Sequence, residues 1–201
     1  MSHPHPNLGS FVRFANATER RRTTVLSRLQ QENESEYSPM KDHWKQMRDA
    51  VRRDRRTTRD GAEVRKAAEV AADRKRPSYE RVAAHWTDVI DQWADSRYVP
   101  PLTADADVFG LSVHVVPAFF ERRPDASHDV VLTYFNAERL AESTVNDVLR
   151  VVSFAVQGSS FVPTLVDLGR GGVHREITEP LDDIDDRLSR LAESFQRNWA
   201  A

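Results

Sequence analysis

The stretch VFGLSVHVVPAFFERRPDASHDVVLTYFN, residues 108–136, decides the fold of the C-terminal half. Apolar and more polar residues alternate over 111–116, which indicates a half-buried β-strand. Pro117 cannot donate a backbone hydrogen bond, so this strand is expected to end there or to lie at a sheet edge. Residues 130–135 predict a second strand, and ERRPDASHD (121–129) is expected to be the turn that joins the two strands into a hairpin.

The residues that follow predict the same order of elements a second time. Ser143 is a suitable N-cap for a helix. Residues 164–168 and 173–177 then predict a second hairpin around a glycine-rich turn, and Pro180 opens a last helix. The C-terminal half is therefore expected to be α+β, with an antiparallel sheet of two β-hairpins, each followed by a helix.

The residues before this half predict helices. Ser10 is a suitable N-cap for the first helix, and the pair Ser38–Pro39 predicts the start of a second. Residues 57–61 contain β-branched residues and a glycine, which should interrupt that helix. Ser78 is the expected cap of the clearest helix, which carries a wide apolar face with two tryptophans.

These patterns divide the 201 residues into three parts. Residues 1–9 are expected to be a flexible N-terminus, 10–98 a charged helical region, and 99–201 an α+β region of the order ββα-ββα. Hydrophobic residues make up 39% of the chain and charged residues 30%. A chain of this length can bury one sizeable core, so the helical and α+β regions are expected to share one.

Composition excludes several classes of protein. The chain has no cysteine, which rules out disulfides, thiolate metal sites and cysteine nucleophiles. No stretch approaches the roughly 18 apolar residues that a membrane span needs, and the N-terminus does not have the pattern of a signal peptide. The expectation is a cytoplasmic protein without a membrane association and without a cofactor.

Charge is distributed unevenly along the chain. Residues 1–98 carry 20 basic and 15 acidic side chains, and the remaining residues carry 9 and 16. The segment 41–76 holds 13 basic and 7 acidic residues. Four arginines recur there at helical spacing, a set called the arginine row below: Arg48, Arg52, Arg55 and Arg59. A row of guanidinium groups can bind phosphates or an acidic partner, although interleaved aspartates also fit a solvated helix with local ion pairs.

Catalytic signatures are weak. A candidate catalytic cluster is Asp129, Asp167, Arg170 and His174. The turn Gly169–Gly172 leads into a strand rather than a helix, so a hairpin turn is expected there in place of a phosphate-binding loop. The histidines lack the close spacing of HxH or HExxH motifs, so the sequence predicts no metal site.

Several segments carry a resemblance. In the order DHWKQMRDAV (42–51), VHVVPAFF (113–120), VVLTYFNAERLAES (130–143) and LVDLGRGGVHREI (165–177), the chain resembles a group of uncharacterised bacterial proteins of about this length. The resemblance implies a bacterial origin and a shared architecture, and it brings no known activity.

Three functions remain open at this point. The leading expectation is a non-enzymatic bacterial accessory protein that binds a protein partner or associates with itself, because edge strands and a charged helical region are present without a catalytic constellation. The alternative is a nucleic-acid-binding component that uses the basic helical region and acts in defence or in mobile-element biology. The third is an enzyme of unknown class.

Overall fold

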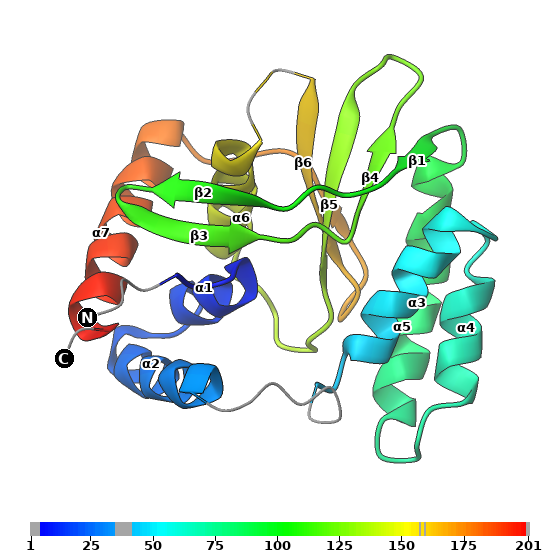
Figure 1. The fold of residues 1–201 in the computed structure, drawn as a ribbon, viewed down its shortest axis with the longest axis horizontal. Helices are drawn as coiled ribbons and strands as arrows, with labels where there is room; N and C mark the ends of the chain where they lie inside the picture. The colour runs from blue at the N-terminus through cyan, green and yellow to red at the C-terminus, as the bar shows by residue number, and fades with distance from the viewer. Residues whose placement is uncertain (1–4, 35–41, 157, 159, 200–201) are drawn as a thin grey trace.

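The computed structural model describes residues 5–34, 42–156, 158 and 160–199. Within these ranges the chain is a mixed α/β protein with seven α-helices, one short 3-10 helix and seven strands (Figure 1). The described helices include none that is long and apolar enough to cross a membrane. The mixture of helices and strands confirms the coarse fold prediction.

Most helices precede the strands. The first half contributes α1 (Leu8–Ala15), α2 (Glu19–Glu34), α3 (Lys45–Arg56), α4 (Ala62–Glu69) and α5 (Arg76–Val89), followed by the 3-10 helix η1 (Ile90–Trp93). The second half contributes α6 (Glu142–Ala155) and α7 (Leu181–Trp199). The interruption predicted at 57–61 is present, and both Arg59 and Gly61 have positive φ there, 61° and 82°.

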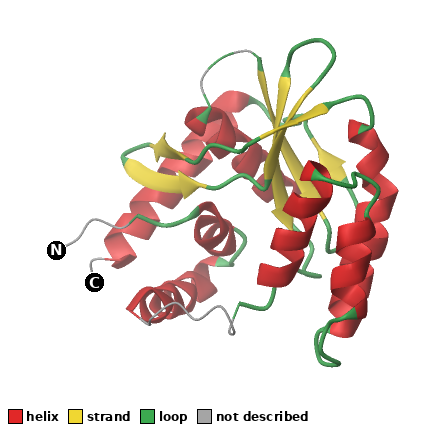
Figure 2. Ribbon diagram, turned by 45° about the vertical axis from the view of Figure 1, so that its right-hand side comes forward, coloured by secondary structure: helices red, strands yellow, loops and turns green. Residues whose placement is uncertain are grey.

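The strands form two sheets. They are β1 (Arg97–Val99), β2 (Ala104–Val108), β3 (Leu111–Val115), β4 (Phe119–Arg122), β5 (His128–Tyr134), β6 (Phe161–Asp167) and β7 (Val173–His174). Five strands lie in the order β1-β4-β5-β6-β7, and β2 and β3 form a separate two-stranded sheet. Figure 2 shows the larger sheet between helices.

The first predicted hairpin is wrong in its pairing. Residues 111–115 pair with β2 upstream of them, through a two-residue turn at Phe109 and Gly110, where both φ angles are positive. Residues 128–134 pair instead with β4. Pro117 explains the difference, because β3 ends before this proline and the chain then enters the other sheet.

The prediction of an antiparallel sheet is also wrong at its centre. Strands β5 and β6 are parallel, and α6 is the crossover between them. Val130 and Val131 are both fully buried, so β5 is covered on both faces, as is typical of a parallel strand. The second predicted hairpin is present as the antiparallel pair β6 and β7, although β7 is only two residues long.

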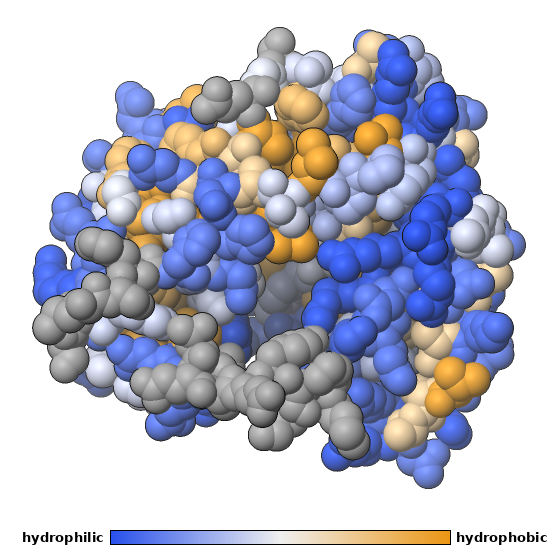
Figure 3. All heavy atoms as spheres, viewed as in Figure 1, coloured by the Kyte–Doolittle hydropathy of each residue, from blue (hydrophilic) through white to orange (hydrophobic). Residues whose placement is uncertain are grey.

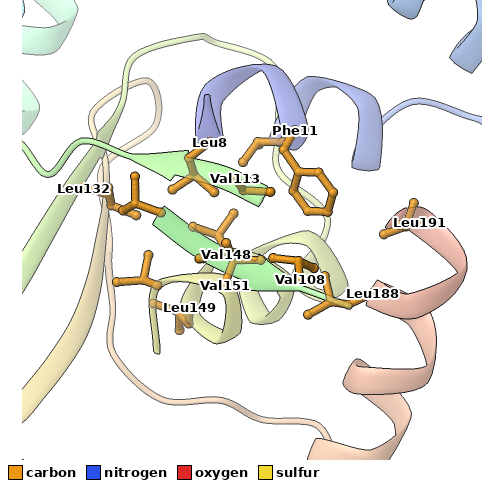
Figure 4. Close-up of a cluster of buried hydrophobic side chains, with 14 of the residues drawn as sticks. Leu8, Phe11, Val108, Val113, Leu132, Val148, Leu149, Val151, Leu188 and Leu191 are labelled. Carbon is orange, nitrogen blue, oxygen red and sulfur yellow. The ribbon is translucent and has the colours of Figure 1, made fainter. Parts of the chain in front are cut away.

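The larger sheet separates two hydrophobic clusters. One cluster joins the sheet to α6, the β2–β3 hairpin, α1, α2 and α7. Figure 4 shows part of it, where Val108 and Val113 of the hairpin lie close to Val148 and Val151 of α6. The other cluster joins the opposite face of the sheet to α3, α4, α5 and η1. Helices from both halves of the chain thus cover the larger sheet.

The N-terminal segment differs from expectation where it is described. Helix α1 begins at Leu8, and the side chain of Asn7, rather than Ser10, caps it by accepting a hydrogen bond from the Ser10 amide at 2.8 Å. Leu8 is buried, so part of the segment expected to be flexible packs on the core. The helix start predicted at Ser38–Pro39 lies outside the described residues.

Candidate functional site

Arg48, Arg52 and Arg55 of the arginine row lie on α3, and Arg59 follows the end of this helix. Arg55 is 1% exposed, and its Nε donates to Glu121 Oε1 of β4 at 2.8 Å. Its Nη2 also donates to the backbone oxygen of Trp93 at 3.2 Å. Glu121 is itself fully buried, so this is an interior ion pair between a helix and a strand.

Arg59 and Ser96 complete the environment of the same carboxylate. Arg59 Nη2 lies 3.4 Å from Glu121 Oε2, and Ser96 Oγ donates to that oxygen at 2.7 Å. Arg59 Nη2 also donates to the backbone oxygens of Trp93 at 3.0 Å and Ser96 at 2.6 Å. The Glu121 carboxylate therefore has three hydrogen-bond donors, which is what a buried charge requires.

The other two arginines of the row also bind protein groups. Arg48 forms an ion pair with Asp42. Arg52 donates to the backbone oxygens of Ala118 at 3.2 Å and Pro117 at 3.4 Å, in the link between β3 and β4. All four guanidinium groups thus bind acceptors within the chain, and Arg55 has almost no contact with solvent.

Asp129 lies next to Glu121, as its cross-strand neighbour on β5. It is fully buried, and Arg123 binds it through two hydrogen bonds of 2.7 and 3.1 Å. Trp93 Nε1 donates to it at 2.8 Å, and Thr164 Oγ1 at 3.2 Å. A buried carboxylate with this many donors has its orientation fixed by the surrounding structure.

A further arginine, which the sequence did not single out, joins this group. Arg175 Nη2 lies 3.5 Å from Asp129 Oδ2, and its guanidinium carbon lies 5.4 Å from the centre of the Trp93 ring. Burial lowers the pKa of Arg175, while the charge of Asp129 acts in the opposite direction. Two carboxylates and four guanidinium groups thus form what is called the ionic network below: Glu121, Asp129, Arg55, Arg59, Arg123 and Arg175.

The four residues of the predicted catalytic cluster do not come together. Asp129 is aligned with Val162 near the start of β6, whereas Asp167 is aligned with Tyr134 at the other end of the same pair of strands. This spacing along a strand is about 16 Å. Among the four, the structure brings Asp167 next to Arg170, whose backbone amide donates to Asp167 Oδ1 at 3.1 Å.

Asp167 organises the glycine-rich turn between β6 and β7. Its Oδ1 also accepts from the Gly169 amide at 2.9 Å. A Cβ atom at Gly169 would lie 1.9 Å from the backbone oxygen of Asn136, so only glycine fits at this position. The turn leads into β7, and His174 lies in that strand, half-buried. The contacts of Asp167 are those of a carboxylate that stabilises its own turn.

The tip of the β2–β3 hairpin has a different character. Phe109 is 46% exposed and has a φ of 51°, in the left-handed region. Its ring packs edge-on against Phe154 of α6 at 6.0 Å between centres. A shallow hollow of about 320 Å³ adjoins it, lined by Asp107, Phe109, Gly110, Phe154 and Asp185. The face drawn in Figure 3 is hydrophilic over α3 and more apolar over the hairpin.

Contacts from two helices hold this tip in place. Gln196 of α7 donates to the backbone oxygen of Gly110 at 2.8 Å, and Asp107 accepts from the Gly110 amide at 2.7 Å. Arg150 of α6 lies 4.5 Å from the centre of the Phe154 ring and binds Asp185 of α7 through two hydrogen bonds of 2.7 and 2.6 Å. The sequence signal for this site was an aromatic residue before a glycine, at a position where asparagine or aspartate is usual.

Comparison with known proteins adds no assignment to this geometry. No protein-family model matches the chain, and no match was found among curated proteins.

Proposed function

We propose that the protein acts without catalysis, by binding another protein chain through the tip of its β2–β3 hairpin. The bound chain is a protein partner or a second copy of the same chain. The single observation that carries the proposal is Phe109, which is half-exposed, held in the left-handed region and braced by α6 and α7. The proposal includes an accessory role in a bacterial cytoplasm, of which the resemblance described above supports the bacterial origin.

The backbone conformation of Phe109 supports a role outside folding. A bulky residue in the left-handed region costs roughly 1–2 kcal/mol, which glycine would avoid and asparagine would reduce. The ring is 46% exposed, so burial within the same chain offsets only part of that cost. Strained residues that the surrounding structure holds in place are concentrated at binding sites, and aromatic residues are common anchors in protein interfaces.

The surroundings of Phe109 suit a second protein surface. The exposed ring stands beside the hollow that Phe154 and Asp185 help to line. A projecting side chain next to a hollow is self-complementary across a twofold axis, because each copy can insert its ring into the hollow of the other. The same pair of features also suits an unrelated chain that presents an apolar side chain.

The two alternatives have less support from the geometry. The arginine row, which would have contacted nucleic acid, donates to acceptors within the chain. Asp129 and Asp167, which would have shared a catalytic site, lie at opposite ends of the β5–β6 pair. Neither arrangement offers an open group of side chains for phosphate binding or for acid–base chemistry.

The test compares Phe109→Asp with a matched control, Val70→Asp. Val70 is 75% exposed and lies just after α4, away from the hairpin. Molar mass is measured by light scattering from low to high micromolar concentration. If the occupant is a second copy, the mass of the native protein rises with concentration, Phe109→Asp stays monomeric, and Val70→Asp behaves like the native protein.

A photo-crosslinking residue at 109, with the same residue at 70 as control, tests for a different partner in the source cells. Protein adducts that form at 109 and not at 70 support the proposal. A monomer at all concentrations, together with no adduct specific to 109, would overturn it. A salt-dependent affinity for short DNA or RNA that is unchanged by Phe109→Asp would favour the nucleic-acid alternative instead.

A further inference from the structure

A group of potential metal ligands lies on the β2–β3 hairpin, outside the sites described so far. His5, Asp105 and His114 each offer one ligand atom, and these three atoms all lie within 4.8 Å of one another. The residues are far apart in the sequence, so no spacing motif connects them. Their side chains are 50%, 54% and 38% exposed, in the order given.

The fold brings the three residues together through backbone pairing. Asp105 is the cross-strand partner of His114, so their side chains leave the hairpin on the same face. The N-terminal segment runs beside β3, where the His114 amide donates to the Pro6 oxygen at 2.8 Å and Asn7 forms a parallel bridge with His114. Because Asn7 also caps α1, the backbone is fixed immediately after His5.

The distances are close to those of a coordination shell. Asp105 Oδ1 lies 2.7 Å from His114 Nδ1 and 3.2 Å from His5 Nε2. In a tetrahedral zinc site with bonds of about 2.0–2.1 Å, neighbouring ligand atoms are about 3.3 Å apart. The two distances from Asp105 are therefore within a few tenths of an ångström of those in a zinc site, and the two histidine nitrogens lie within 4.8 Å of each other.

The chemistry of the donors indicates the class of cation. Two imidazole nitrogens and one carboxylate oxygen suit Zn²⁺ and neighbouring divalent transition metals, whereas Ca²⁺ and Mg²⁺ prefer oxygen ligands alone. Three protein ligands on an exposed surface leave a fourth position that water can fill.

We propose that His5, Asp105 and His114 bind a divalent transition-metal ion of the zinc class, which ties the N-terminal segment to the β2–β3 hairpin. The site goes beyond the proposed function and does not depend on it, since the ligands are separate from Phe109 and the hollow beside it. Binding joins a residue that precedes α1 to both strands of the hairpin, so the metal would act as a clamp between the N-terminal segment and the hairpin.

The test is a titration of metal-free, untagged protein with Co²⁺, whose visible absorption reports tetrahedral coordination by nitrogen and oxygen ligands, followed by displacement with Zn²⁺. One equivalent is expected to bind to the native protein. His5→Ala, Asp105→Asn and His114→Ala should each weaken binding by about tenfold or more. The matched control is Asp107→Asn, which removes a carboxylate from the same strand without touching the cluster, and circular dichroism checks that each variant is folded.

The outcomes separate clearly. Loss of the absorption band in the three ligand variants, with the band retained in Asp107→Asn, supports the site. Absence of a band in the native protein overturns it, and so does equal binding in all variants. Binding that survives His5→Ala also overturns the proposal, because the N-terminal segment would then not be clamped. Zn²⁺ should in addition raise the melting temperature of the native protein and leave that of Asp105→Asn unchanged.

Discussion

The two faces of the five-stranded sheet are buried in different ways. Toward α6 and the β2–β3 hairpin, the central strands bury apolar side chains such as Phe120, Val130 and Leu132. Toward α3, α4 and α5, the same strands bury Glu121 and Asp129 beside apolar neighbours. One face is thus held by apolar packing, and the other combines apolar packing with the ionic network.

The two faces therefore place different requirements on the sequence. Apolar packing depends on total volume and tolerates exchange among residues of similar size. A buried ion pair adds little net stability, because desolvation offsets the attraction, but removal of one partner leaves an uncompensated charge. The charged face should therefore be intolerant of single changes, and the apolar face should respond in proportion to the volume removed.

The largest effect is expected from Glu121→Ala. This change removes the carboxylate bound to Arg55, which is 1% exposed and keeps its hydrogen bond to the Trp93 backbone oxygen. The free energy of unfolding should fall by about 3–5 kcal/mol, as is typical when one partner of a buried pair is removed. Urea unfolding followed by tryptophan fluorescence measures it, since Trp86 and Trp93 are buried on this face.

A double variant tests whether the cause is the unpaired charge. Arg55→Met with Glu121→Leu replaces both partners by apolar residues of similar size, and it should lose much less stability than Glu121→Ala alone. If the double variant is as unstable as the single one, packing volume rather than charge would explain the loss, and the two faces would not differ in kind.

A smaller loss is expected on the apolar face from Leu149→Ala. Leu149 of α6 is 1% exposed and belongs to the cluster shown in Figure 4. Leu149→Ala should lower the free energy of unfolding by about 3 kcal/mol, and the volume-conserving Leu149→Ile should lower it by less than about 1.5 kcal/mol. Urea unfolding measures both variants. If Leu149→Ile lowers the free energy of unfolding as much as Leu149→Ala does, the apolar face does not tolerate a change of side-chain shape at constant volume.

The sequence predicted the local features of the fold better than the pairing of its strands. Local signals were sufficient for the helix interruption at 57–61 and for the turn between β6 and β7, because glycine, proline and β-branched residues act on their own neighbours. Strand pairing was not predicted correctly for 111–115, because an apolar alternation specifies the buried face of a strand and not the strand beside it. The sequence likewise did not show that β5 and β6 are parallel. A helix in the position of α6 can connect two parallel strands, and it can equally follow a hairpin.

The candidate sites show the same limit. The helical spacing of the arginine row predicted one side of a single helix, but α3 ends at Arg56, before Arg59. Spacing alone also does not show whether such a side meets solvent or a buried glutamate. Asp129 and Asp167 looked close because both were assigned to hairpin ends, and the parallel register separates them. His5, Asp105 and His114 meet only through the β2–β3 pairing and the N-terminal segment, so no motif could reveal them.

The smallest expected effect is a pH dependence of the free energy of unfolding. It arises at the edge of the apolar face, where one arginine binds two carboxylates. Arg187 donates to Asp147 at 2.8 Å and to Glu179 at 2.7 Å. Burial raises the pKa of Asp147 above its ordinary value, although the hydrogen bond from Arg187 opposes the shift. Hydrogen bonds from Asn146 and Arg187 lower the pKa of the more exposed Glu179.

The two shifts have opposite consequences for stability. The contribution of Glu179 is present above its ordinary pKa and is lost as the pH falls through its folded value; screening by solvent should keep it below about 1 kcal/mol. The contribution of Asp147 is most favourable below its ordinary pKa and declines as the pH rises through its folded value. Urea unfolding of the native protein, Glu179→Gln and Asp147→Asn from neutral pH to about pH 3 measures both contributions.

On acidification, the stability difference between the native protein and Glu179→Gln should therefore shrink, while the difference between the native protein and Asp147→Asn should shift in favour of the native protein. Glu176→Gln, at an exposed carboxylate in the same connection before α7, controls for the general effect of removing a charge. If the differences for Glu179→Gln and Asp147→Asn change in the same direction, Arg187 does not hold the two carboxylates in distinct environments. Burial would then matter less at this edge than the charge of the arginine, and the contrast between the two faces would be confined to the ionic network.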